Sequence, residues 1–187
     1  MARIPYPDPK TLAPGDRQLL ESLPQLNISK LLAGSPSMFQ PLTRVFSAYL
    51  NNGILDPKLR EIAILRVGYR RESDYEITHH KRAASVVGLS EDRIAALEPG
   101  NKLDVFNSIE LDVIKYVDEL VQLGKVSSQV FDQLRKSLDD KRLIELTVVV
   151  GVYTMVSQIC SAFELELEEE PIASTGMEDI GKALDKL

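Results

Sequence analysis

Residues 56–70, DPKLREIAILRVGYR, contain the clearest helix signal in the chain. Asp56 is a capping residue, and Pro57 follows it at the first helical position, where the missing proline N–H breaks no intrahelical hydrogen bond. A helix that is apolar on most sides is normally buried. The stretch therefore predicts a buried helix from residue 57 to about residue 70. Its apolar positions, which wrap around most of the helix circumference, are Leu59, Ile62, Ala63, Leu65 and Val67.

Helical signals continue on both sides of this stretch and predict an all-α fold. Residues 1–15 are expected to form an extended arm, because they hold four prolines, which fix φ and remove hydrogen-bond donors. In residues 36–51, apolar side chains recur at spacings of three and four, which is typical of an amphipathic helix. The segment 99–107 is predicted to be a loop. In chain order, the predicted helices cover residues 16–23, 36–51, 57–70, 73–88, 90–97, 109–123, 127–137 and 144–163.

The last of these helices is the ambiguous one. Residues 146–153, LTVVVGVY, are rich in β-branched side chains, which favour strands. The apolar segment is much longer than a strand, however, since strands usually stop at about 4–8 residues. We therefore predict a helix that is buried on most sides, in the core or at a subunit interface. Its length would also suit a membrane span, but Glu145, Gln158 and several hydroxyl residues argue against one.

The composition indicates a globular protein of one domain, or one domain with a short appendage. The chain has 187 residues, of which 44% are hydrophobic and 27% are charged. We divide it into an N-terminal arm with a short helix (1–35), a helical domain (36–166) and a C-terminal tail (167–187). The net charge is −6 and no basic block stands out, so no nucleic-acid partner is expected. No apolar run at the N-terminus resembles a signal peptide, which predicts a cytoplasmic protein.

Cysteine and histidine are scarce in this chain. Its one cysteine, Cys160, can form neither an intrachain disulfide nor a Cys-x-x-Cys redox pair. We expect Cys160 to behave as a small buried apolar residue. With two histidines in the whole chain, a structural zinc site is not expected, and we predict no bound metal.

Glu76 and His80 form the strongest candidate for a chemical centre. They are four residues apart in the segment 73–80, SDYEITHH, so on a helix they share a face about one turn apart. A carboxylate in that position can orient the imidazole ring and raise its pKa. An imidazole held in this way can transfer a proton near neutral pH. The connection to the preceding helix is short, so we expect Glu61 on that helix to approach the same site.

Arginine side chains near this centre are candidates for substrate binding. Arg66 and Arg70 are predicted to bind an anionic substrate, because a guanidinium group binds a carboxylate bidentately. Arg60 and Arg71 are candidates for the same role. Tyr153, in the apolar helix, is a further candidate to face the substrate.

Each of these residues also has a purely structural interpretation, which the residues alone leave open. Ser73 and Glu76 have the spacing of a capping box, in which the Glu side chain returns to the backbone of the cap residue. His80 fits an ordinary helix histidine, and the arginines fit ion pairs with acidic side chains. Tyr153 fits a core residue whose hydroxyl has found a partner.

Three sequence blocks occur in a fixed order: LREIAILRV at residues 59–67, YEITHH at residues 75–80 and AASVVGLS at residues 83–90. Together they resemble the carboxymuconolactone decarboxylase family, whose superfamily includes the AhpD-type alkylhydroperoxidases. The resemblance covers roughly residues 40–165. It implies an AhpD-like helical bundle that forms homotrimers or homohexamers and acts on a small molecule.

In the peroxidase branch of that superfamily, a Glu is followed by Cys-x-x-Cys and then by His. The resemblance matches Glu61 to that Glu and His80 to that His, while Ser73 and Glu76 stand at the two cysteine positions. A thiolate is the nucleophile that peroxide and disulfide exchange require, and neither Ser nor Glu replaces it. An AhpD-like antioxidant function is therefore disfavoured.

The decarboxylase branch has Glu-x-x-x-His at the place of Glu76 and His80. The resemblance therefore implies a cofactor-free lyase that acts on a small, anionic lactone or enolisable acid. His80 would be the acid, Glu76 its partner or a second acid or base, and Glu61 a carboxylate of the same pocket. The N-terminal extension and the longer C-terminal half indicate a paralogue with its own substrate. A non-catalytic oligomeric protein that binds a ligand is the remaining alternative.

Overall fold

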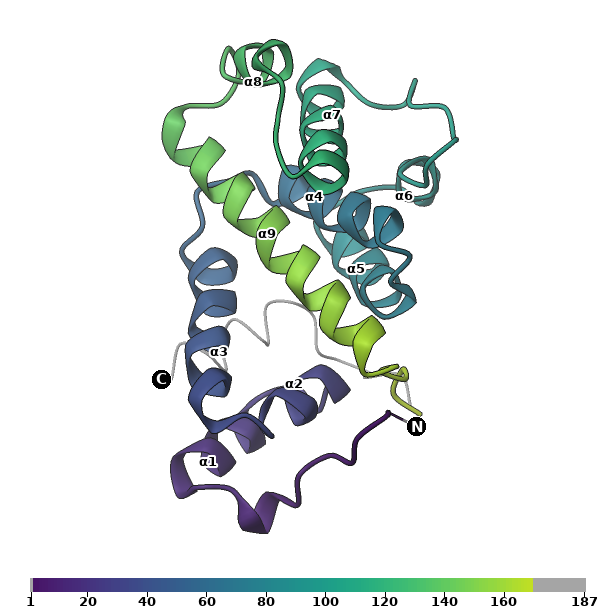
Figure 1. Cartoon of the computed structure of the whole chain (residues 1–187). Coiled ribbons are helices and arrows are strands. Elements are labelled where there is room, and N and C mark those ends of the chain that lie inside the picture. The colour runs from purple at the N-terminus through teal and green to yellow at the C-terminus, as the bar shows by residue number, and fades with distance from the viewer. Residues whose placement is uncertain (1, 170–187) are drawn as a thin grey trace. The chain divides into compact units, whose positions relative to one another are not determined.

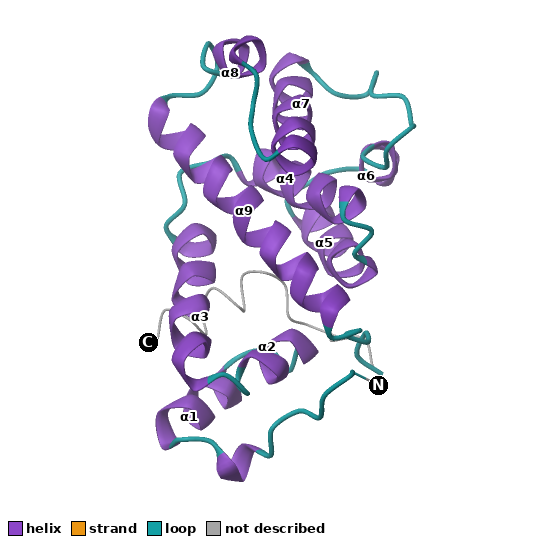
Figure 2. Ribbon diagram, viewed as in Figure 1, coloured by secondary structure: helices purple, strands orange, loops and turns teal. Residues whose placement is uncertain are grey.

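The computed structural model describes residues 2–169, and over these residues the chain is helical without strands (Figures 1 and 2). The predicted all-α fold is confirmed. A 3-10 turn at Pro9–Thr11 precedes the α-helices in the N-terminal arm. The α-helices are α1 Pro14–Ser22, α2 Asn27–Leu32, α3 Pro36–Asn51, α4 Pro57–Arg70, α5 Asp74–Val86, α6 Glu91–Ala96, α7 Ser108–Leu123, α8 Ser128–Leu134 and α9 Asp140–Ala162.

The chain forms two compact units, the first of which combines both ends of the described chain. It consists of residues up to 53 together with residues from 160 onward. In this unit α1 and α2 pack against α3. The backbone N–H of Arg3 donates to the carbonyl of Phe163 at 2.8 Å, so the N-terminal arm is attached to the segment that follows α9.

The second unit, residues 54–159, is built around α4 and carries the predicted site. Helix α4 packs against α5 and α7, while α8 packs on α7 and α6 on α5. Every residue of α4 from Leu59 to Gly68 is buried, which confirms the predicted buried helix. The helix begins as expected, because the Asp56 side chain accepts hydrogen bonds from the N–H groups of Lys58 and Leu59.

A tight connection folds α5 back against α4. Glu72 adopts a positive φ of 52°, and the N–H of Ser73 donates to the Gly68 carbonyl at 3.0 Å. Gly68 allows the two helices to approach closely, since a Cβ there would lie 3.2 Å from Cγ1 of Ile77 and 3.6 Å from Cβ of Glu76. The close approach of the α4 backbone at Gly68 thus helps to fix the position of Glu76.

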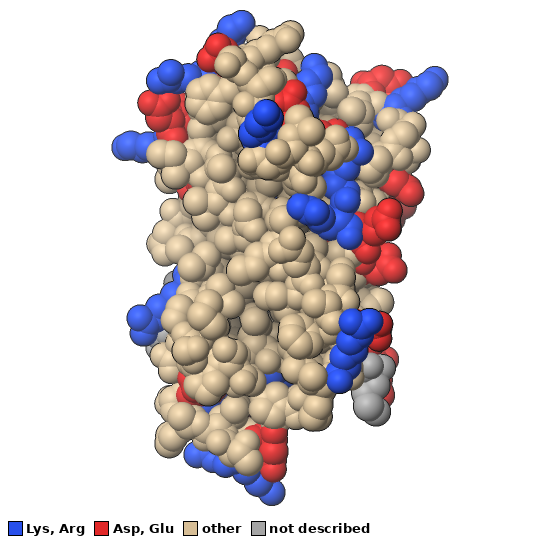
Figure 3. All heavy atoms as spheres, in the orientation of Figure 1, with Lys and Arg blue, Asp and Glu red and all other residues tan. Residues whose placement is uncertain are grey.

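Helix α9 resolves the ambiguity between strand and helix in favour of the helix. Within the single chain, however, the helix is buried along one face, so the part of the prediction that places it at a subunit interface stays a prediction. Ile144 is 66% exposed and Val148 is 48% exposed, and the surface over α9 carries few charged side chains (Figure 3). The buried residues recur at helical spacing along one face, and they are Leu143, Leu146, Val149, Val150, Tyr153, Val156, Ser157 and Cys160.

Within residues 2–169, α9 is the one helix whose length and hydropathy would suit a membrane crossing. Its side chains make polar contacts within the second unit. The Tyr116 hydroxyl lies 2.8 Å from the Thr147 hydroxyl, and Glu145 accepts hydrogen bonds from the N–H groups of Ile54 and Leu55. These contacts describe a helix packed into a protein core along one face.

The remaining differences from prediction concern short elements and helix ends. Helix α2 was not predicted, because six residues are too few to reveal a helical period. Helix α8 ends at Leu134, and the three residues after it form turns instead of completing the helix expected up to 137. Helix α9 begins at Asp140, four residues before the apolar run. The predicted C-terminal tail lies largely outside the described residues.

Candidate acid–base site

Glu61, Glu76 and His80 lie together inside the second unit. The His80 ring is held from both sides: Nδ1 lies 2.8 Å from Oε2 of Glu61, and Nε2 lies 3.7 Å from Oε2 of Glu76. Because a carboxylate only accepts, Nδ1–H is the donor in the shorter contact. The longer one exceeds hydrogen-bonding distance and is electrostatic. Glu61 therefore orients the ring, and Nε2 faces Glu76.

The three side chains are almost completely removed from solvent. Glu61 is 0% exposed, and Glu76 and His80 are each 5% exposed. Buried charges need partners, and Arg60 supplies a positive one, with Nε 3.3 Å from Oε1 of Glu61. With His80 protonated, the two positive and two negative groups balance. With His80 neutral, the group carries one net negative charge.

This charge balance determines the direction in which the His80 pKa moves. Burial alone would lower the pKa of His80, because it disfavours the imidazolium. The charge and hydrogen bond of Glu61 and the charge of Glu76 act in the opposite direction, and Arg60 weakly opposes them. The net effect raises the pKa of His80 above its ordinary value. The site thus favours the protonated form of the buried imidazole more than water does.

Tyr153 contributes an aromatic wall to the same site. Its ring packs edge-on against the His80 ring, with centroids 4.7 Å apart and planes at 88°. Tyr153 lies on α9, His80 on α5 and Glu61 on α4, so three helices distant in sequence meet at the imidazole. The structure therefore brings together Glu61, Glu76, His80 and Tyr153.

The capping alternative for Glu76 can be compared with a capping box elsewhere in the chain. At the start of α7, Asn107 accepts from the N–H of Glu110, and the Glu110 carboxylate accepts from the N–H of Asn107. At the start of α5, Ser73 makes no side-chain capping bond, and its own N–H donates to the Gly68 carbonyl. Glu76 is directed to His80 instead.

Arg66 and Arg70 lie in a separate ionic cluster. Nε and Nη2 of each arginine donate to the Asp118 carboxylate at 2.6–2.7 Å, and Nη1 of Arg66 donates to the Leu97 carbonyl at 2.7 Å. Burial alone would raise the pKa of Asp118, but the hydrogen bonds and charges of the two arginines outweigh it and hold this pKa below its usual value. The structure thus pairs both arginines with an acid on α7.

Asp118 is the residue of this cluster that the sequence did not reveal. It lies 52 residues from Arg66 and 48 from Arg70, and no local spacing connects them. The sequence predicted a helix at each of the two places, α4 and α7, but not that they pack together. Which acid would meet the arginines depended on that packing.

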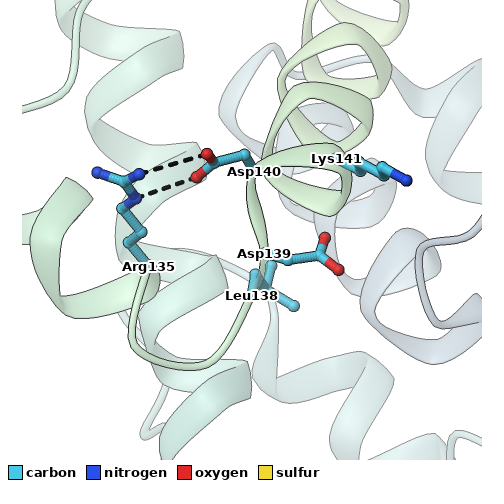
Figure 4. A pocket seen from close by; sticks show the side chains of 5 residues that line it. All are labelled: Arg135, Leu138, Asp139, Asp140 and Lys141. Atoms are coloured by element: carbon cyan, nitrogen blue, oxygen red, sulfur yellow. Dashed lines mark hydrogen bonds and ion pairs between the residues drawn. The ribbon is translucent and has the colours of Figure 1, made fainter.

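A shallow pocket of about 400 Å³ lies elsewhere, at the junction before α9 (Figure 4). Its charged lining is largely satisfied locally, since Arg135 points to Asp140 and donates to it at 3.0 Å. Its lining contains none of the residues of the acid–base site: it consists of Arg135, Leu138, Asp139, Asp140 and Lys141. Within residues 2–169, no group of three or more His, Cys, Asp or Glu side chains has the arrangement of a metal site.

Comparison with known proteins agrees with the fold and with the motif order. Residues 36–119 match the carboxymuconolactone decarboxylase family. A peroxidase-related protein from Ralstonia eutropha JMP134, described as an alkylhydroperoxidase AhpD core, superposes with a TM-score of 0.74 at 16% identity, over 90% of this chain and 93% of that chain. The matched segment is therefore similar to that family, and the chain has an AhpD-like fold.

A second structural relative of this AhpD-like chain is a peroxidase-related protein from Silicibacter sp. TM1040. It superposes with a TM-score of 0.76 at 15% identity, over 92% of this chain and 93% of that chain. At such identities the similarity concerns the fold. No curated protein matches the chain. The two positions that the resemblance assigns to the cysteine pair of AhpD peroxidases hold Ser73 and Glu76 here, both buried.

Proposed function

We propose that this AhpD-like protein is a cofactor-free acid–base enzyme of the carboxymuconolactone decarboxylase type. Its substrate would be a small, anionic lactone or another enolisable acid. One observation carries the proposal: a buried imidazole is oriented by Glu61 on one nitrogen and faces Glu76 with the other. General acid–base catalysis needs a proton held near neutral pH at a fixed position, and this arrangement supplies one.

The proposed reaction needs one proton from the protein. As the carboxylate leaves as CO2, its bonding electron pair passes into the unsaturated lactone, which becomes an enolate. His80 then donates the proton on Nε2 to the carbanionic carbon, directly or through Glu76. Glu61 keeps its hydrogen bond to Nδ1 throughout, so the ring stays oriented while its charge changes. His80 recovers a proton from solvent, and the sum is RCO2⁻ plus H⁺ giving RH plus CO2.

Burial of the site supports this chemistry in two ways. Removal of water strengthens the electrostatic interaction between the imidazolium and a developing enolate. It also disfavours a solvated carboxylate relative to neutral CO2. The 4.7 Å contact with Tyr153 places an aromatic wall where water would otherwise reach the ring.

The AhpD-like peroxidase function is the alternative named by the structural relatives. It requires a thiolate at the acid–base site, and the two positions that the resemblance assigns to the cysteine pair hold the hydroxyl of Ser73 and the carboxylate of Glu76. Cys160, the one cysteine of the chain, is buried on α9. The proposal therefore favours proton transfer over thiol redox chemistry.

We extend the proposal to a cytoplasmic homo-oligomer, a trimer or a hexamer. The exposed apolar side chains Ile144 and Val148 on α9 support self-association, because patches of this kind commonly mark interfaces. Light scattering coupled to size-exclusion chromatography separates trimer from hexamer. A monomer at micromolar concentration would contradict this part of the proposal.

The decisive experiment is a screen for CO2 release. Wild-type protein is incubated with a panel of unsaturated lactone acids and β-keto acids, and CO2 is detected with a coupled carboxylation assay. A substrate is expected to be consumed by wild type, with turnover greatly reduced in His80→Gln and Glu76→Gln. If a substrate is found and neither substitution changes its turnover, the assignment of the site is wrong. A panel without any turnover contradicts the proposed reaction class.

A further inference from the structure

Two buried hydroxyl groups of the second unit have no hydrogen-bond partner. Ser73 is 3% exposed and Ser157 is 1% exposed, and the Oγ atom of each is unpaired. A buried hydroxyl without a hydrogen bond costs about 1–3 kcal/mol, so such groups are uncommon in folded proteins. Two of them, one at the N-cap of α5 and one on α9, call for an explanation beyond folding.

Local partners were available to both hydroxyls and are used by other residues of the chain. A helical Ser or Thr can donate to the carbonyl four residues earlier. Thr147 does so on α9, donating to Leu143 at 2.7 Å, and Ser85 does so on α5, donating to Lys81 at 3.0 Å. Ser127 caps α8, accepting from the N–H of Val130. Ser157 and Ser73 make neither kind of bond.

Both hydroxyls are close in sequence to residues of the acid–base site. Ser73 is the N-cap of α5, the helix that carries Glu76 and His80, and it precedes Glu76 by three residues. Ser157 follows Tyr153 by four residues on the buried face of α9, and the Tyr153 ring contacts His80. One hydroxyl thus lies at the start of the helix that carries Glu76 and His80, and the other lies one turn from Tyr153 on α9.

We propose that Ser73 Oγ and Ser157 Oγ are hydrogen-bond donors to carbonyl-type oxygens of the substrate, either its carboxylate or its lactone carbonyl. This inference rests on the proposed function, since it names the groups that orient the substrate against His80. Glu61 and Glu76 already supply acceptors at the site, whereas an oxygen-rich anion needs donors. The two unpaired hydroxyls provide these hydrogen-bond donors when the substrate binds.

The neutrality of these donors suits a leaving carboxylate. Arg66 and Arg70, the arginines expected to bind the anion, are bound to Asp118. A guanidinium ion would stabilise the carboxylate before it reacts, and binding that is lost in the transition state slows the reaction. Hydroxyl groups orient the anion with less of this stabilisation. They also remain in place to donate to an enolate oxygen as charge moves there.

The test compares stability with binding in Ser73→Ala and Ser157→Ala. The probe is 5-oxotetrahydrofuran-2-carboxylate, a saturated lactone acid that cannot pass its electrons into a double bond. In ligand-free protein both variants are expected to unfold at the same temperature as wild type or higher, because an unsatisfied buried hydroxyl is removed. By calorimetry, each should bind the probe about tenfold more weakly, the loss expected for one hydrogen bond to a charged or polarised oxygen.

Ser85→Ala is the matched control. Ser85 lies on α5 like the site residues, but it is exposed and its hydroxyl is already bonded to Lys81. Its probe affinity should equal that of wild type. Two further probes identify the oxygen concerned: cyclopentanecarboxylate carries the carboxylate alone, and γ-butyrolactone carries the lactone alone. If a serine contacts the carboxylate, its substitution by alanine should weaken the binding of cyclopentanecarboxylate. If it contacts the lactone carbonyl, the substitution should weaken the binding of γ-butyrolactone.

Three results would overturn the inference. One is wild-type probe affinity in both serine variants, which leaves the proposed function intact because CO2 release tests that separately. Another is a marked loss of thermal stability in both, which would assign the hydroxyls to the fold, for example through a buried water. The third is failure of wild type to bind any probe. Conversely, weakened binding in the serine variants without any effect of His80→Gln on turnover would refute the proposed chemistry and retain the binding site.

Discussion

Helix α4 carries two ionic clusters, and they differ in how completely their charges are satisfied. Toward its C-terminal end, Arg66 and Arg70 saturate Asp118 with four hydrogen bonds of 2.6–2.7 Å. Toward its start, Glu61 makes one short bond to His80 and a 3.3 Å contact with Arg60.

The two clusters differ in how well they suit acid–base chemistry. The Asp118 cluster has complementary, bidentate geometry and is partly exposed, with 21% of the Asp118 side chain accessible. Such a pair stabilises a helix–helix contact and has no reason to exchange protons. The His80 cluster is fully buried, holds a titratable imidazole and leaves a 3.7 Å gap on the Nε2 side. These are the features that proton transfer requires, and they suit the role proposed for His80.

The largest expected effect separates the two clusters by activity. His80→Gln should lower kcat/KM by about 10²–10⁴-fold on a substrate found by CO2 release, because positioned acids contribute rate factors of this size. Far-UV circular dichroism should be unchanged. Arg70→Gln, in the other cluster, should retain most of the activity per folded molecule. Equal losses in the two variants would show that the clusters do not differ in function.

The next effect separates them by stability. Asp118→Ala leaves two arginines without their carboxylate and should lower the free energy of unfolding by about 2–3 kcal/mol, below the range for fully buried pairs because the site is partly exposed. Urea denaturation measures this. Asp140→Ala removes a carboxylate from an exposed pair with Arg135 and should have a much smaller effect. A negligible change in Asp118→Ala would mean that the cluster does not hold α4 and α7 together.

Glu76→Gln tests the proposed role of the carboxylate that faces Nε2 of His80. The amide has the same shape as the carboxylate but cannot take up or release a proton, so turnover should fall about 10–100-fold. Stability should change little, since Ser73 and Glu76 do not form a capping box. A matched substitution, Glu110→Gln, keeps the capping box of α7, since Gln also serves there, but removes the charge that pairs with Arg93, and it should affect stability without affecting turnover. Glu76→Gln would behave like Glu110→Gln if Glu76 were only structural.

The smallest expected effect concerns how folding stability depends on pH. The contributions of His80 and Asp118 to stability should change with pH in opposite directions. The pKa of His80 is raised in the folded state, so its contribution to stability is complete below its unfolded pKa of about 6.5 and is lost as the pH rises through the folded value. The pKa of Asp118 is lowered, so its contribution is present above its unfolded pKa of about 3.8 and is lost as the pH falls through the folded value.

Urea titrations of wild type, His80→Gln and Asp118→Asn across a range of pH measure these contributions. The stability difference between wild type and His80→Gln should shrink toward alkaline pH. The difference between wild type and Asp118→Asn should shrink toward acidic pH. Parallel curves for the two variants would contradict the contrast between the clusters.

Local sequence signals predicted most of the helices and the candidate acid–base residues. Capping at Asp56 and the apolar period of α4 are local properties, so they predicted a buried helix whose bounds the structure reproduces. The spacing of Glu76 and His80 is also local, and together with the motif order it indicated the acid–base pair. Local signals failed for α2, because six residues carry no readable period.

The partners of the candidate site residues depend on tertiary packing. From the sequence, Arg66 and Arg70 could bind a substrate or form ion pairs. The packing of α4 against α7 brings Asp118 to both arginines. The apolar sequence of α9 predicted burial on most sides, whereas packing buried one face. The physical reason is the same in each case. Helix periodicity is set by neighbours within one or two turns, whereas ion pairing and burial depend on residues that only folding brings near.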